Sequence, residues 1–86
     1  MPVDAPMGQR WINPEKARYY RVVLEQDLFG VWNLIACWGG LHSHRGGMRV
    51  TALASLDAGV AALDGIANRR RQRGYVPVPL PPDPSA

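Results

Sequence analysis

The sequence predicts an α+β fold, in which a small antiparallel β-sheet of three to five strands carries one α-helix packed across one face. Three observations support this prediction. Several short segments are rich in aromatic and β-branched residues whose side chains alternate in character. A single later stretch repeats apolar residues at helical spacing. The chain has 86 residues, which is enough for one small domain.

The predicted strands lie in the first two thirds of the chain. Residues 18–25 form a half-buried strand, and residues 26–30 contain an aspartate and a glycine that suit a hairpin connection. Residues 31–38 are apolar on both faces, which places this strand near the middle of the sheet. Two glycine pairs, at 39–40 and 46–47, are expected to turn the chain sharply before and after a short polar loop. A further strand then follows at 48–54.

The helix is expected to begin after Ser55, which is a favourable N-cap residue. Gly59 and Gly65 weaken the helix and are expected where it packs closely on the sheet. Four arginines occupy the last turn, Gly74 ends the helix, and residues 75–76 add a short edge strand. The apolar stripe consists of Leu56, Val60, Leu63, Ile66 and Ala67.

Both ends of the chain are expected to be flexible tails around a domain of residues 10–76. Residues 1–9 contain two prolines and a glycine and show no apolar periodicity. Residues 77–86 are rich in proline, which fixes φ and removes backbone donors, so this tail is expected to be extended. Such tails are usually plain disordered ends, and the alternative is a ligand for a partner domain with an aromatic groove.

The composition favours a cytoplasmic protein with no membrane partner. The single cysteine, Cys37, excludes an intramolecular disulfide and indicates a reducing compartment. No apolar stretch approaches the ~20 residues of a membrane span, and no signal-peptide pattern is visible. The net charge is +3, and Lys16 is the only lysine. Arginine suits phosphate well, although the same charge also serves solubility.

No pattern of catalytic residues is present, so neither an enzyme activity nor a cofactor nor a small-molecule substrate is expected. The sequence has no paired carboxylates, phosphate loop or nucleophile with a base and an orienting group. His42, His44 and Cys37 make at most three metal ligands, whereas a closed zinc site needs four, so no metal is expected. Cys37 is interpreted as an inert buried residue, and the histidines either cap a turn or contact phosphate.

Several short motifs together resemble the WGR domain family, which is named after a Trp-Gly-Arg tripeptide. In order, they are Arg-Tyr-Tyr at 18–20, Leu-Phe-Gly-Val-Trp at 28–32, Trp-Gly at 38–39, Arg-Gly at 45–46, Ser-x-x-Ala at 55–58 and Arg-Gly-Tyr at 73–75. No single motif is specific, but their order and spacing resemble the family over about residues 11–76.

The resemblance implies a non-catalytic domain. WGR domains occur in some poly(ADP-ribose) polymerases, where they bind DNA near a break, and also as small bacterial proteins. In the polymerases the motif tryptophan stacks against sugar at a strand end, which makes Trp38 the corresponding residue here. Gly40 replaces the motif arginine. Either the DNA role is weakened, or Arg45 or Arg49 supplies the charge.

These considerations define a predicted site and two functional hypotheses. Trp38 is either a stacking platform or a core residue. Arg70 and Arg71 lie off the apolar stripe and are expected to be free for a ligand, whereas the neighbouring arginines complement the helix dipole. The first hypothesis is a nucleic-acid-binding module for DNA ends or breaks. The second is a protein-interaction or regulatory module that has lost DNA binding. The predicted nucleic-acid-binding residues are Trp38, Gly39, Gly40, Arg45, Arg49, Arg21, Arg70 and Arg71.

Overall fold

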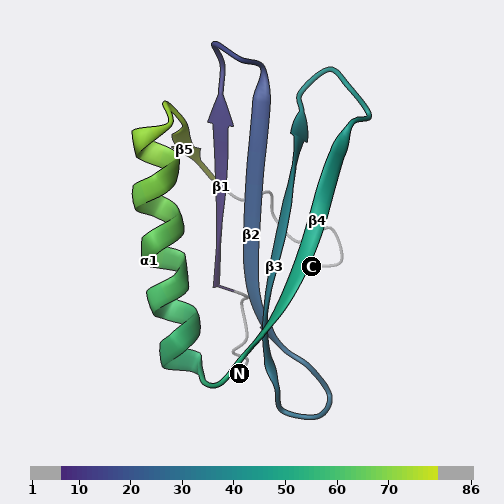
Figure 1. The fold of residues 1–86 in the computed structure, drawn as a ribbon, viewed down its shortest axis with the longest axis vertical. Helices are drawn as coiled ribbons and strands as arrows, with labels where there is room; N and C mark the ends of the chain where they lie inside the picture. Colours follow the sequence, from purple (N-terminus) through teal and green to yellow (C-terminus); the bar gives the residue numbers. More distant parts are fainter. Residues whose placement is uncertain (1–6, 80–86) are drawn as a thin grey trace.

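The computed structural model describes residues 7–79, which form one five-stranded antiparallel sheet and one α-helix (Figure 1). The order of the strands across the sheet is β4-β3-β2-β1-β5. The predicted α+β fold is therefore confirmed. The elements are β1 (Met7–Asn13), β2 (Arg18–Gln26), β3 (Trp32–Gly40), β4 (Gly46–Leu53), α1 (Leu56–Gln72) and β5 (Val76–Val78).

Strand β1 was missed by the sequence analysis, and it begins at Met7, inside the predicted tail of residues 1–9. Two of its residues that face α1, Gln9 and Asn13, are polar, so the strand lacks the alternation of apolar and polar residues expected of a half-buried strand. Gln9 Nε2 donates a hydrogen bond to the carbonyl of Leu63, and Asn13 Nδ2 donates to the carbonyl of Arg73. These polar side chains therefore fasten the helix to the sheet. The remainder of that predicted tail, residues 1–6, lies outside the described residues.

Strand β5 extends the sheet beyond the predicted domain end at residue 76. It pairs antiparallel with β1 at the edge of the sheet, with Pro77 opposite Trp11. Proline is compatible with an edge strand because its missing N–H removes no ladder bond on the free side. The predicted short edge strand is thus present but runs on to Val78. Residues 80–86 of the proline-rich segment lie outside the described residues.

The central strand of the sheet is β2, and β3 is its inner neighbour. The prediction that the chain turns sharply at both glycine pairs is wrong. Gly39 and Gly40 end β3, and Gly46 and Gly47 begin β4, with Gly39 paired to Gly46. Among the described residues, the glycines with positive φ are Gly30 and Gly74 alone. The paired glycines therefore serve close packing, as described below, rather than a sharp turn.

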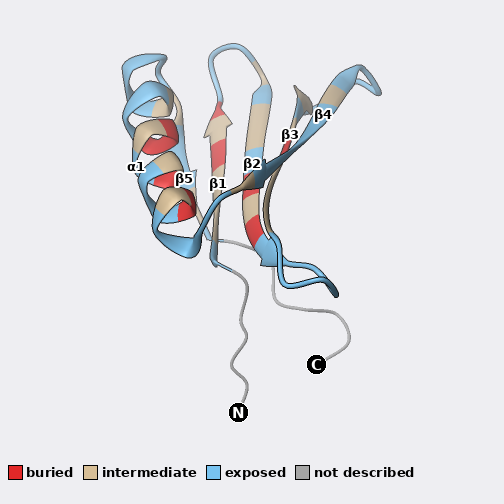
Figure 2. Ribbon diagram, turned by 60° about the horizontal axis from the view of Figure 1, so that its bottom comes forward, coloured by how far each residue is buried: buried red, intermediate tan, exposed pale blue. Residues whose placement is uncertain are grey.

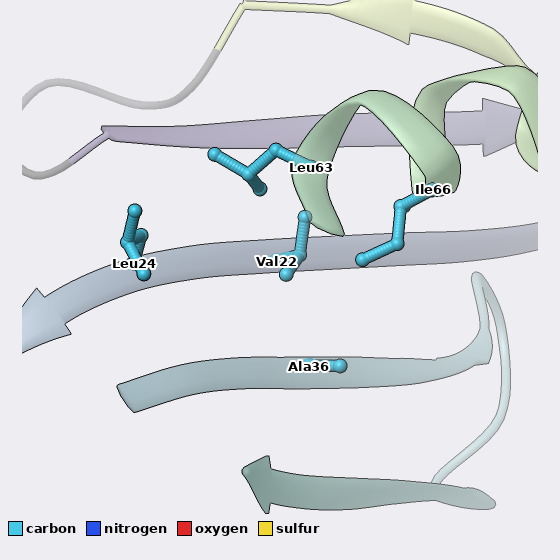
Figure 3. Close-up of a cluster of buried hydrophobic side chains, with 5 residues drawn as sticks. All are labelled: Val22, Leu24, Ala36, Leu63 and Ile66. Carbon is cyan, nitrogen blue, oxygen red and sulfur yellow. The ribbon is translucent and has the colours of Figure 1, made fainter. Parts of the chain in front are cut away.

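The hydrophobic core lies between α1 and the middle of the sheet. Figure 3 shows Leu63 and Ile66 of α1 pointing toward Val22 and Leu24 of β2, with Ala36 of β3 beside them. All five side chains are buried. The buried parts of the helix and of β1–β3 face one another in Figure 2, whereas β4 is largely exposed. One side of the helix and one face of the sheet therefore supply this core.

The helix begins after Ser55 as predicted, since the Ser55 side chain accepts a hydrogen bond from the Ala58 N–H. Its buried side differs from the predicted stripe, because Leu56 and Val60 are exposed. A Cβ on Gly59 would lie only 2.6 Å from Leu24 Cδ1, so the helix contacts the sheet through this glycine. Gly65 has ordinary space around it and makes no such close approach. The buried residues of the helix are Gly59, Leu63, Ile66 and Ala67.

The hairpin between β2 and β3 is organised by the carboxylate of Asp27. Asp27 Oδ1 accepts hydrogen bonds from the N–H groups of Phe29 and Val31, and Oδ2 accepts one from Asn33 Nδ2 at 3.0 Å. Gly30 completes the turn with a φ of 82°. The bonds from Val31, Asn33 and Phe29 hold the pKa of Asp27 below its ordinary value of 3.8.

The stability of the hairpin is expected to depend on pH below about pH 4. Because the pKa of Asp27 is lower in the folded chain, its contribution is complete above 3.8 and is lost as the pH falls through the folded value. Thermal unfolding between pH 5 and pH 2 is expected to show a larger loss for the native chain than for Asp27→Asn. A difference between the two melting temperatures that stays constant over this range would contradict the prediction.

Candidate nucleic-acid interface

Trp38 stands near the end of β3 on the face of the sheet that also carries α1. Its indole lies directly over Gly47 of β4, where a Cβ would be 2.7 Å from Cζ2 and 2.8 Å from Cε2. The ring is nearly parallel to that of Tyr20 on β2, with an interplanar angle of 13° and centroids 6.3 Å apart. The Trp38 side chain remains 36% exposed. The indole of Trp38 therefore packs on the backbone of Gly47 and beside the ring of Tyr20, while part of it faces solvent.

The glycine pairs explain this placement. Gly46 has no room for a side chain, since a Cβ there would meet the carbonyl oxygen of Trp38 at 2.2 Å. A Cβ on Gly39, the residue paired with Gly46, would lie 2.7 Å from the Arg45 carbonyl oxygen and 3.1 Å from Tyr19 Cε1. Side chains at these positions would push β4 and its loop away from β3. The glycines thus allow the two strands and the indole to approach closely.

An open groove of about 600 Å³ lies at the end of the sheet beside Trp38. Three segments meet there: the β1–β2 turn, the β3–β4 loop, and the chain leaving the C-terminal end of α1. All three lie at the same end of the molecule in Figure 1. The groove is lined by Lys16, Ala17, Arg18, Tyr19, Tyr20, Trp38, Gly39, Gly40, His42, Ser43, Arg45, Gly46, Arg70 and Tyr75.

Hydrogen bonds hold these three segments together. The Leu41 N–H donates to the carbonyl of Ala17 at 2.8 Å, which joins the β3–β4 loop to the β1–β2 turn. Asn13, only 4% exposed, accepts from the Lys16 N–H and donates to the Arg73 carbonyl, so it links the same turn to the end of the helix. The groove is thus built by contacts between loops that are distant in sequence.

The charged residues that line the groove are all basic. They are Lys16, Arg18, Arg45 and Arg70, and none of the described lining residues is acidic. Four tyrosine and tryptophan residues, Tyr19, Tyr20, Trp38 and Tyr75, stand among them. Aromatic rings interleaved with cations match the two requirements of a nucleic-acid surface, which are stacking on bases or sugars and neutralisation of phosphate.

The structure brings together only part of the predicted site. Arg45 lines the groove with Trp38 and the glycines at 39–40. Arg49 lies on the same face of the sheet as Trp38 but outside the groove lining. Arg21 pairs with Cys37 and therefore points to the opposite face, because side chains alternate along a strand.

The two helix arginines also differ from the prediction. Arg70 is half-buried rather than free: its guanidinium carbon lies 4.4 Å from the ring centroid of Tyr20 and 4.9 Å from that of Tyr75. Arg71 lies over Trp11 at 5.4 Å and does not line the groove. Arg70 thus belongs to the groove, and Arg71 covers another part of the domain.

Sequence reasoning missed Lys16, Arg18, Tyr20 and Tyr75 as groove residues. They lie 18 or more positions from Trp38 in the chain, and only the tertiary structure brings them close. The signal that was available is the alternation of β2, which puts Tyr20 on the same face as the core residues of that strand. Of the two histidines, His42 lines the groove and His44 does not.

The described residues contain no group of three or more histidine, cysteine or acidic side chains arranged to hold a metal ion. Within the same part of the chain, no helix has the length and apolar character needed to cross a membrane.

A family comparison decides the classification of the chain. The model of the WGR domain matches residues 4–80, which is nearly the whole sequence. The chain belongs to the WGR domain family. WGR domains are nucleic-acid-binding rather than catalytic domains, and this supports a nucleic-acid-binding type of module in general. Comparisons with curated proteins and with solved structures gave no significant match.

Proposed function

We propose that this WGR domain binds DNA at ends or breaks through the groove beside Trp38. The observation that carries the proposal is a partly exposed tryptophan in a groove whose charged lining residues are all basic. Trp38 stacks on a base or sugar, and the basic residues around it neutralise phosphates. Membership of the WGR family supports the nucleic-acid part of this proposal.

The preference for ends follows from how Trp38 is held. One face of its indole rests on Gly47, so a ligand has access only to the remaining exposed surface. Inside a continuous duplex each base is covered by its neighbours, whereas an end or a nick presents an uncovered base and sugar. Stacking on a single fixed ring is therefore favoured at a discontinuity in the strand.

The phosphate contacts are assigned to the cations of the groove. Arg45 lies in the loop that follows the Trp-Gly motif, and Lys16 of the β1–β2 turn and Arg18 at the start of β2 line the same groove. Gly39 and Gly40 line the groove without side chains that would hinder the approach of a strand. The side chains of Arg21 and Arg71 lie outside this interface and are not part of the proposal.

The proposal is tested by fluorescence anisotropy with labelled duplex, nicked and single-stranded DNA over a series of salt concentrations. Four cations line the groove. Each neutralised phosphate contributes about −0.9 to the slope of log K against log salt for duplex DNA, so the steepest slope expected is roughly −3 to −4. Linear or nicked DNA is expected to compete better than covalently closed circular DNA. Equal competition by closed circles would refute the preference for ends, and absence of binding at low salt would refute the function.

A second candidate function is a protein-interaction module, and one observation favours it. Leu28 and Phe29, at the tip of the β2–β3 hairpin, are 101% and 90% exposed. Exposed large apolar side chains that lie together are typical of contact surfaces. Absence of DNA binding, combined with salt-resistant capture of a protein that requires both side chains, would favour this candidate over the first.

A further inference from the structure

We infer that Arg70, supplied by the C-terminal end of α1, is a phosphate-binding residue of the groove and takes the place of the motif arginine that position 40 lacks. This inference deepens the proposed function and rests on it, because the ligand is the same nucleic acid.

The position of Arg70 is determined by the end of the helix. Gly74 has a φ of 85°, and its N–H bonds the carbonyl of Arg71, while the Tyr75 N–H bonds the carbonyl of Arg70 at 2.9 Å. This pair of bonds is a Schellman motif, which reverses the chain and brings the residue after the glycine back over the last turn. Tyr75 therefore lies against the side chain of Arg70, in the place where such motifs usually have an apolar contact.

The guanidinium of Arg70 is held in a defined orientation. It contacts the ring of Tyr20 from the sheet and the ring of Tyr75 from the helix end, with centroid distances of 4.4 and 4.9 Å. Planar stacking on aromatic rings suits arginine and leaves the edge of the guanidinium for hydrogen bonds. A side chain that is already ordered loses little conformational entropy when it binds a ligand.

The groove gives this charge no counter-ion. Arg70 Nε is buried without a hydrogen-bond partner in the described part of the chain, and none of the described residues lining the groove is acidic. A half-buried charge is stabilised by pairing, so an anion that enters the groove is favoured beside the guanidinium of Arg70. Tyr20 contacts both Arg70 and the Trp38 ring, which places the anion site beside the stacking site.

Position 40 cannot provide the same group without rearrangement. A Cβ at Gly40 would lie 3.0 Å from the Ser43 Cβ, which is tighter than most real contacts, so the β3–β4 loop occupies the space beside it. Gly40 lines the groove from the end of β3, and Arg70 lines it from α1. A cation from α1 therefore substitutes for one from β3.

The test compares Arg70→Gln and Arg70→Lys with a matched control, Arg69→Gln. Arg69 is the adjacent helix residue, is exposed, and does not line the groove, so its replacement removes the same charge elsewhere. DNA binding is measured as a function of salt, at a temperature where thermal unfolding shows each variant to be folded. Arg70→Gln is expected to weaken binding ~10- to 100-fold, the range of a charge-assisted hydrogen bond, and to reduce the salt slope by about one.

Arg70→Lys separates a phosphate contact from a purely structural role. It keeps the charge but loses the planar fork, so the salt slope is expected to remain while the affinity falls. If Arg70→Gln does not fold, Arg70→Lys alone decides: unchanged affinity and unchanged slope would overturn the inference. If native protein binds DNA and Arg70→Gln behaves like Arg69→Gln, the inference about Arg70 fails and the proposed function stands. If native protein binds no DNA at low salt, both fail.

Discussion

Replacing Trp38 with alanine is expected to weaken binding to DNA ends by about 5- to 150-fold, which corresponds to the ~1–3 kcal/mol of one base–aromatic stack. The indole is the largest ring in a groove whose charged lining residues are all basic. Its loss removes the stacking surface but leaves the cations, so the salt slope is expected to change little. Anisotropy with end-labelled duplex DNA measures both quantities.

Two further variants control this result. Phe29→Ala removes an aromatic ring that is 90% exposed on the β2–β3 hairpin. This hairpin lies at the other end of the sheet from the β3–β4 loop (Figure 1), so the affinity of the variant for DNA is expected to equal that of the native chain. Trp38→Phe retains a smaller ring over Gly47 and is expected to bind with intermediate affinity. A folded Trp38→Ala variant with native affinity would show that the indole is a packing residue and would end the stacking proposal.

Replacing Leu24 with alanine is expected to lower the free energy of unfolding by about 3–5 kcal/mol, as for other fully buried leucines. Leu24 is 1% exposed and lies in the core that joins β2 to α1 (Figure 3). It also lies directly against Gly59, where the helix packs on the sheet without room for a side chain. The lost methyl groups leave a cavity that a helix held at this distance cannot easily fill. Urea denaturation measures the change.

Leu28→Ala is the matched control for this prediction. It is the same substitution at a leucine that is 101% exposed, and it is expected to change the free energy of unfolding by no more than about 0.5 kcal/mol. Native stability is typically ~5–15 kcal/mol, and a small domain lies toward the lower end, so Leu24→Ala is expected to leave little margin. Equal effects of the two substitutions would mean that α1 is not packed on β2 as described.

The same helix that completes the core also completes the groove. Leu63 and Ile66 pack on the sheet, and one turn later the same side of the helix carries Arg70 into the groove. Asn13 then ties the helix end to the β1–β2 turn. Loss of packing at the core is therefore expected to disturb the groove as well.

The elements that local patterns encode were predictable from the sequence. Alternation of apolar residues identified β2, β3 and β4, and Ser55 and Gly74 bounded the helix through capping chemistry. The ordered set of short motifs identified the WGR family. Each of these signals lies within a few residues of the structure it determines, which is why a single sequence carries it.

The composition of the groove was decided only by the tertiary structure. Strand pairing placed Tyr20 beside Trp38 and turned Arg21 to the other face, and helix docking placed Arg70 against Tyr20. The role of Gly47 as the support of the indole likewise depends on the register of β4 against β3. These relations join residues far apart in the chain, and their register and docking angle depend on packing over the whole domain. For that reason the sequence alone determined the fold class and the family and singled out Trp38 as the proposed stacking residue, whereas the tertiary structure determined which cations share the groove with Trp38.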